Sequence, residues 1–185
     1  MSTVQSLVTA EEFVRMSFDT PVELVEGEVV TAPPPDHVHG NVCFRVISAL
    51  SRWYFGIGSQ SGQISTNDGG VLTRRDPDTV RGADVSYLGA DRIPGGKLRR
   101  RQFDLVPTLC IEVLSEFDRW RDVHRKIDEY LERGVNEVWI VDSKNRHVQV
   151  FRSDDPPVTF PEGSELTSDQ LPGFSCPVAE FFTGV

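Results

Sequence analysis

The sequence predicts a single α/β or α+β domain in which helices flank a mixed β-sheet. Two nearly continuous apolar runs, at residues 107–114 and 136–142, have the length and composition of strands that are covered on both faces. Amphipathic segments at residues 39–54 and 119–133 carry apolar residues at helical spacing and alternate with these strands. Because a chain of 185 residues fits one domain, we expect one fold over residues 1–185.

The first elements are predicted to be a short helix and a β-hairpin. Residues 9–12 have the spacing of a capping box, with a hydroxyl at the cap and a carboxylate three residues later, so a helix is expected to about Ser17. Two short β segments within residues 22–31 flank Glu26-Gly27, a typical hairpin turn. The prolines at residues 33–35 then form a stiff break before the first long helix.

The middle and the end of the chain supply the other strands. Short strands are expected over residues 63–66, 71–73 and 83–88. Gly134 should end the second long helix, and a turn at residues 143–145 should join strand 136–142 to an outer strand over residues 146–152. The acidic, proline-containing tail from residue 154 is expected to pack on the core through Leu171, Phe174, Phe181 and Phe182.

The composition excludes several classes of protein. The chain has 19 Lys and Arg against 28 Asp and Glu, a net charge of −9, which excludes a generally basic nucleic-acid coat. No apolar run has the length of a membrane helix, and residues 1–10 lack the pattern of a signal peptide. The scattered Cys43, Cys110 and Cys176 predict reduced thiols in a cytoplasmic protein, with neither a disulfide framework nor a thiolate zinc site.

Glu112 is the most informative residue, because it interrupts an apolar strand. A buried carboxylate needs a salt-bridge partner, a proton or a cation to offset its desolvation. A structural pair with an arginine and a functional role are both open on residue type alone. Asp84 lies 28 residues earlier in another short strand, and two carboxylates on adjacent strands could hold Mg²⁺. An aspartate at a strand end is also commonly just solvated.

Three further side chains each have more than one interpretation. Lys126 shares a helical stripe with Asp122 and Tyr130, so it either forms a surface pair with Asp122 or reaches the carboxylates to act on water or phosphate. Glu23 either points inward as a further carboxylate or is exposed. His39 is a helix-start residue, a metal neighbour or a proton-transfer group, and a lone histidine is more often structural.

A basic loop stands out against the acidic composition. It is either a solvated loop or a local patch that grips a nucleic-acid backbone. Its basic residues, with no acid among them, are Arg92, Lys97, Arg99, Arg100 and Arg101.

Taken together, these stretches resemble the Uma-type restriction endonuclease family within the PD-(D/E)XK nuclease superfamily. The resemblance covers nearly the whole chain, and it is carried by the order and spacing of the motifs. They are Val22 to Glu28, His39-Gly40, Ala83 to Leu88, Cys110 to Ser115, Asp122 with Lys126 and Tyr130, Gly134 to Asp142, and Leu171 to Phe174.

The resemblance implies a restriction-endonuclease-like sheet and a metal-dependent phosphodiesterase site. Asp84 and Glu112, with the carbonyl of Val113, would be the metal ligands for Mg²⁺ or Mn²⁺. The superfamily lysine usually stands where this chain has Leu114, so the resemblance points to Lys126 on the next helix instead. Glu23 and His39 match the remaining family positions and complete the implied catalytic set.

Two substitutions depart from the family pattern. Ala83 replaces a proline before the aspartate, and Glu116 replaces a proline after Ser115. Neither removes an implied ligand, but Glu116 adds negative charge close to the implied site.

Two functions are therefore considered. The first is a divalent-metal-dependent endonuclease that hydrolyses nucleic-acid phosphodiester bonds, with DNA as the expected substrate and a homodimer as the expected form, because duplex cleavage needs two sites. The alternative is a non-catalytic nucleic-acid-binding or accessory module that retains the nuclease fold. A purely structural acidic cluster is a third interpretation.

Overall fold

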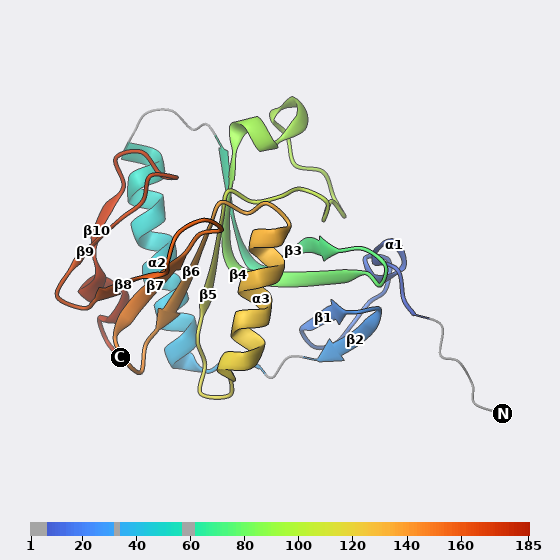
Figure 1. The fold of residues 1–185 in the computed structure, drawn as a ribbon, viewed down its shortest axis with the longest axis horizontal. Helices are drawn as coiled ribbons and strands as arrows, with labels where there is room; N and C mark the ends of the chain where they lie inside the picture. The colour runs from blue at the N-terminus through green and yellow to red at the C-terminus, as the bar shows by residue number, and fades with distance from the viewer. Residues whose placement is uncertain (1–6, 32–33, 57–61) are drawn as a thin grey trace.

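The computed structural model describes residues 7–31, 34–56 and 62–185, and there the chain forms an eight-stranded mixed sheet flanked by helices (Figure 1). Hydrogen-bonded neighbours follow the order β2-β1-β4-β5-β6-β7-β8, with β3 on the other edge of β4. The strands are β1 (Val22–Val25), β2 (Glu28–Thr31), β3 (Gly62–Arg74), β4 (Thr79–Gly89), β5 (Leu109–Val113), β6 (Glu137–Asp142), β7 (His147–Phe151) and β8 (Val158–Pro161).

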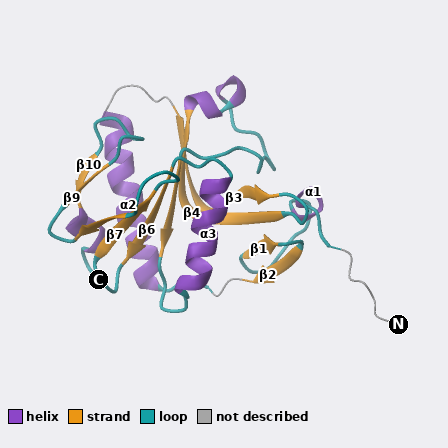
Figure 2. Cartoon of the chain, viewed as in Figure 1, coloured by secondary structure: helices purple, strands orange, loops and turns teal. Residues whose placement is uncertain are grey.

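Two long helices cover the two faces of this sheet, and Figure 2 shows that they make up most of the helical structure. The α-helices are α1 (Ala10–Phe13), α2 (His37–Gly56) and α3 (Trp120–Glu132), and the short 3-10 helices are η1 (Ala90–Arg92), η2 (Pro94–Gly96) and η3 (Val178–Phe182). Residues of α2 pack on one set of strand side chains, and residues of α3 pack on the opposite set. The parallel neighbours β5 and β6 are buried along their whole length, as their apolar sequences predict.

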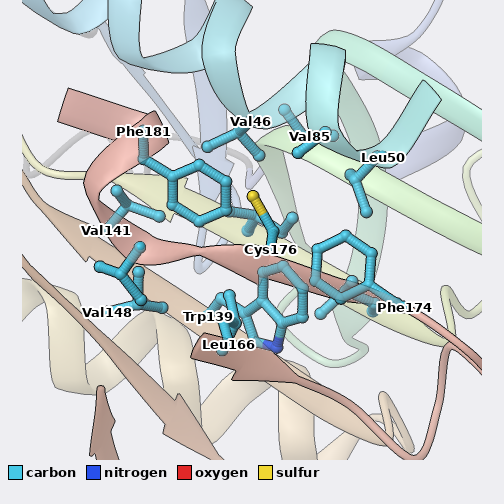
Figure 3. Close-up of a cluster of buried hydrophobic side chains, with 14 of the residues drawn as sticks. Val46, Leu50, Val85, Trp139, Val141, Val148, Leu166, Phe174, Cys176 and Phe181 are labelled. Atoms are coloured by element: carbon cyan, nitrogen blue, oxygen red, sulfur yellow. The ribbon is translucent and has the colours of Figure 1, made fainter. Parts of the chain in front are cut away.

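The C-terminal tail closes the core on the face of α2. It forms a small antiparallel sheet of β9 (Glu165–Thr167) and β10 (Ser175–Pro177), followed by η3. Figure 3 shows Phe174 and Phe181 against Trp139 and Val148 of the large sheet. The four apolar tail residues that the sequence indicated are all buried, so this prediction is confirmed.

The structure corrects three of the predictions about these elements. The capping box forms as predicted, but α1 ends at Phe13 rather than near Ser17. Strand β7 is not the outer strand, because β8 from the tail pairs with its free edge. The two strands expected at residues 63–66 and 71–73 are one strand, β3, which is interrupted by a bulge after Thr66. Within the predicted proline break, Pro33 lies outside the described residues.

The predicted hairpin turn is present. Glu26 and Gly27 have φ values of 51° and 79°, and Val25 pairs with Glu28 across them. Positive φ at both central residues of a two-residue turn matches the twist of the flanking strands. This turn fixes the register of β1, and therefore the place of Glu23 on it. Among the described helices, none combines the length and hydropathy that crossing a bilayer requires.

Replacing Gly134 by alanine is expected to destabilise the protein by about 1 kcal/mol, the cost of a side chain in the left-handed region. Gly134 follows α3 with a φ of 98°, and a Cβ added there would make only ordinary contact with Val106. Urea denaturation measures the effect. The matched control is Gly163→Ala, where φ is not positive and the added Cβ meets open space, so this variant should not be less stable than the wild type.

Candidate active site

The site begins with a fork in the sheet beside β4. On one edge β4 pairs with β1 only at Val80, and with β5 only from Val85 to Tyr87. Strands β1 and β5 therefore separate from each other between these two points, and the β1–β2 hairpin lies beside the lower half of α3 in Figure 1. Backbone groups along the fork lack a strand partner, and carboxylates take that role: Gly82 N–H donates to Glu23 Oε1 at 3.1 Å.

Asp84 occupies the fork where a β4–β5 backbone pair would otherwise continue. Its Oδ2 accepts the backbone N–H of Val113 at 2.7 Å and lies 3.3 Å from Nε2 of His39. Within the described part of the chain, Oδ1 of Asp84 has no hydrogen-bond partner. Because the N–H and C=O of one strand residue point to the same side, the Val113 carbonyl also faces this edge. Asp84 thus offers one free oxygen beside a backbone carbonyl.

Glu112 is the fourth of the five residues of the buried strand β5 and faces α3. Its Oε1 accepts the hydroxyl of Tyr130 at 2.7 Å, and its Oε2 lies 3.3 Å from Nζ of Lys126. Burial raises the pKa of Glu112 to about 7. The charges of Asp84 and Glu23 also raise this pKa, whereas Lys126 and the hydrogen bond from Tyr130 lower it. The partners that compensate this carboxylate are therefore a lysine and a tyrosine, not the arginine of the structural interpretation.

Lys126 reaches inward from α3. Its Nζ lies 3.0 Å from Glu23 Oε1 and 3.3 Å from Glu112 Oε2. Burial opposes the charge of Lys126, but the two carboxylates outweigh it and hold its pKa above the ordinary value. Among the described residues, Lys126 contacts these two carboxylates in place of the surface pair with Asp122, which contacts Arg121. Lys126 is thus a permanent cation at this site, not a base.

Glu23 is held by a buried arginine network as well as by Lys126. Arg81 contacts Glu23 Oε2 at 2.9 Å and makes a two-pronged contact with Glu129 at 2.6 and 3.0 Å. Burial tends to raise the pKa of Glu23, but Lys126 and Arg81 outweigh it, so this pKa is lowered. Since both oxygens of Glu23 already bind cations or Gly82, Glu23 is better suited to hold Lys126 than to bind metal.

His39 lies in the first turn of α2, where Asp36 Oδ1 accepts its backbone N–H at 2.7 Å. Its ring joins Asp84 on one side and Cys43 on the other, with Nδ1 3.6 Å from Sγ. The hydrogen bond to Asp84 raises the pKa of His39 to about 10, with a smaller contribution from Cys43. At neutral pH this residue is therefore an imidazolium that fixes Asp84, which disfavours a role as a general base.

One cavity of about 620 Å³ is lined by Asp84, Glu112, Lys126, Glu23 and His39. Its walls come from the β1–β2 hairpin, the start of α2, the fork and the N-terminal half of α3, and Arg125 and Asp122 lie on them. The residues that the sequence indicated, and that all line it, are Glu23, His39, Asp84, Glu112, Val113 and Lys126. Glu116 is exposed and is not a lining residue, so its additional charge does not face the cavity.

The basic loop lies elsewhere. None of its five cations is a lining residue of this cavity. Arg92 is bonded internally, to the carbonyls of Pro107 and Gly134 and to the side chain of Asn136. Arg92 therefore ties the loop to the fold, and the other four of its cations, Lys97 and the arginines at residues 99–101, are exposed to solvent.

Two residues of the site were missed by sequence reasoning. Tyr130, which orients Glu112, shares a helical stripe with Lys126 and belongs to a family motif, but neither signal predicts its contact with Glu112. Arg81 gave no signal, because its partners Glu23 and Glu129 lie 58 and 48 residues away in sequence.

The residues present fit a divalent cation. Asp84 and Glu112 face the same cavity, and the charge of Asp84 adds to burial in raising the pKa of Glu112. An unpartnered carboxylate oxygen on Asp84 and the carbonyl of Val113 complete a set of hard oxygen donors, which Mg²⁺ and Mn²⁺ prefer.

The fold is that of a nuclease-like α+β domain, which confirms the predicted fold class. The chain belongs to the Uma2 family, described as "Putative restriction endonuclease", whose family pattern matches residues 10–179. A similar solved structure is described as a "putative nuclease belonging to DUF820" from Anabaena variabilis ATCC 29413. It is 19% identical in sequence and superposes with a TM-score of 0.80 over 95% of this chain and 98% of the other. No protein of curated function matches the sequence.

Proposed function

We propose that this protein is an endonuclease that hydrolyses phosphodiester bonds of nucleic acid and depends on Mg²⁺ or Mn²⁺. One observation carries the proposal: Asp84 and Glu112 face a single cavity, with the ammonium of Lys126 within 3.3 Å of Glu112. Membership of the Uma2 family and the likeness to a structure described as a "putative nuclease" support the same reaction class.

In this proposal Asp84, Glu112 and the carbonyl of Val113 hold the cation. When bound, the cation polarises the scissile phosphate and lowers the pKa of the attacking water. Lys126, a permanent cation, orients that water and offsets the charge that develops on the phosphate. Glu23 and Tyr130 hold Lys126 and Glu112 in place, and His39 fixes the orientation of Asp84.

The proposal extends to substrate, assembly and location. DNA is the proposed nucleic acid, contacted away from the cavity by Lys97 and the exposed arginines at residues 99–101. A homodimer would supply the two sites that cutting a duplex needs. A cytoplasmic location is supported by Cys43, Cys110 and Cys176, which are all unpaired thiols.

The test is a cleavage assay of the full chain with single-stranded, double-stranded and branched DNA and with RNA, in Mn²⁺, in Mg²⁺ and in EDTA. Metal-dependent cleavage of at least one substrate is the expected result. Binding of nucleic acid without cleavage in any condition would instead support the non-catalytic module. If there is neither binding nor cleavage, and EDTA leaves the thermal stability unchanged, the acidic cluster is structural.

The affinity for Mn²⁺ is expected to depend on pH below pH 7. The pKa of Glu112 is raised to about 7, so below this pH the carboxyl carries a proton that the cation must displace. Affinity should therefore rise by up to about tenfold per unit as pH increases towards 7, and level off above it. Calorimetry in two buffers of different ionisation enthalpy counts the released proton. In Glu112→Gln both the proton release and the pH dependence of the affinity should disappear. If the pH dependence persists, it comes from another titrating group.

A further inference from the structure

A second group of metal-binding atoms lies directly behind Asp84. His39 and Cys43 are four residues apart on α2, so their side chains project from the same face of the helix, and Asp84 reaches them from β4. One ligand atom from each residue lies within 4.8 Å of the other two. Cys43 takes no part in the proposed hydrolysis, which leaves its contact with His39 without a role there.

The geometry is close to that of a tetrahedral zinc site. Ligand bonds of about 2.0–2.3 Å to zinc place neighbouring ligands roughly 3.3–3.8 Å apart. His39 Nδ1 is already 3.6 Å from Cys43 Sγ, and Nε2 is 3.3 Å from Asp84 Oδ2. Contraction by about 1 Å, with a turn of the imidazole, brings one nitrogen, the sulfur and one oxygen onto a common ion, and water supplies a fourth ligand.

We propose that Cys43, His39 and Asp84 bind a thiophilic divalent cation of the Zn²⁺ type, and that this cation withdraws Asp84 from the site for Mg²⁺ or Mn²⁺. The spacing of the three cysteines predicts no zinc site built from thiolates alone, and the structure explains why this one is not visible in the sequence. Its third ligand, Asp84, lies 41 residues after Cys43 and is brought there only by the packing of α2 on the sheet.

The ligand set selects against hard cations. A thiolate and an imidazole favour zinc and similar ions, whereas Mg²⁺ prefers oxygen ligands and keeps several waters. Access is available, because His39 and Asp84 line the open cavity and all three side chains are only partly buried. The two kinds of cation would therefore enter through one cavity and be separated by their chemistry.

The two sites share Asp84, so occupancy of one weakens the other. The second half of the inference rests on the proposed function, since it assumes that Asp84 and Glu112 hold a hard cation. With Asp84 turned towards Cys43, the hard cation would have only Glu112 and the Val113 carbonyl left as protein ligands. Zinc is thus expected to inhibit hydrolysis even when Mg²⁺ is in large excess.

Cobalt(II) tests the binding half without any need for activity. Co²⁺ added to the wild type should give tetrahedral visible bands and a near-ultraviolet thiolate-to-metal transition, and Zn²⁺ should abolish them. Cys43→Ser should lose the thiolate transition. Its affinity for Zn²⁺ should fall by at least about 100-fold, a larger loss than the removal of a hydrogen bond that only supports a ligand usually causes. His39→Gln provides a second variant of similar shape.

Cys176→Ser is the matched control, because this buried thiol donates to the Pro177 carbonyl and lies away from the cavity. It should keep the full cobalt spectrum, and a thermal melt of each variant shows that it is folded. Retention of the thiolate transition in folded Cys43→Ser, or absence of any thiolate transition in the wild type, would overturn the site.

Release of Mn²⁺, followed by electron paramagnetic resonance, tests the competition. Zn²⁺ should free bound Mn²⁺ from the wild type and from Cys176→Ser, but not from Cys43→Ser at the same concentration. Equal release from Cys43→Ser would show that zinc competes elsewhere and would reject the shared ligand. If the wild type gives the cobalt spectrum but never binds Mn²⁺, the proposed function fails while the zinc site stands.

Discussion

Lys126→Met is expected to reduce metal-dependent cleavage by about 100- to 1,000-fold, the usual cost of removing one group that stabilises charge in the transition state. The same substitution should strengthen Mn²⁺ binding at pH 8. Lys126 lies within 3.0 Å of Glu23 and 3.3 Å of Glu112, and its removal leaves more negative charge at the cavity. The two effects have opposite signs, which separates a role in chemistry from a role in holding the metal.

Single-turnover cleavage and Mn²⁺ titration of the same preparations provide the measurement. Glu112→Gln should lose cleavage and Mn²⁺ affinity together, because it removes a proposed ligand. Arg121→Met is the control on the same helix, since this cation is largely exposed and, within the described part of the chain, forms an ion pair only with the exposed Asp122. A Lys126→Met protein that cleaves at the wild-type rate would show that the ammonium serves the fold alone.

The parts of the fold that were predictable are those with a local cause. The apolar runs of β5 and β6, the capping box of α1, the turn at Glu26-Gly27 and the stop at Gly134 are each decided by neighbouring residues, and each is present. The error about β7 concerns a partner that is distant in sequence. Strand β8, which comes from the tail, pairs with β7, so β7 is not the outer strand. The periodicity within β7 contains no information about that pairing.

The same distinction holds within the site. Glu112 stands out because a charge in an apolar strand is locally costly, and the helical stripe places Lys126 and Tyr130 together. The fork beside β4 has no local signature, because it arises from where β1 and β5 leave that edge. The charge of a residue in the sequence also does not show where its side chain points. Arg92 belongs to the basic loop, but its guanidinium donates to the backbone carbonyls of Pro107 and Gly134.

The second large effect is expected on stability, when the buried Arg81 beside the site is replaced. Arg81 is 6% exposed and is the partner of both Glu23 and Glu129. Arg81→Met should destabilise the protein by about 3–5 kcal/mol, because it leaves buried carboxylates without their main cation. Lys126 continues to contact Glu23, and Arg125 contacts Glu129 at 3.4 Å, but Arg125 is nearly half exposed and its compensation is correspondingly weak.

Urea denaturation at pH 7 tests this prediction, and two further variants identify the mechanism. Arg74→Met removes an arginine from an exposed pair with Glu26, and it should cost less than about 1 kcal/mol. The double variant Arg81→Met with Glu129→Leu should recover part of the lost stability, because it removes the stranded charge together with its partner. If the double variant is no more stable than Arg81→Met alone, the loss comes from packing around the arginine stem. In that case the position of Glu23, and therefore its contact with Lys126, would be fixed by the shape of the fork and not by the charge of Arg81.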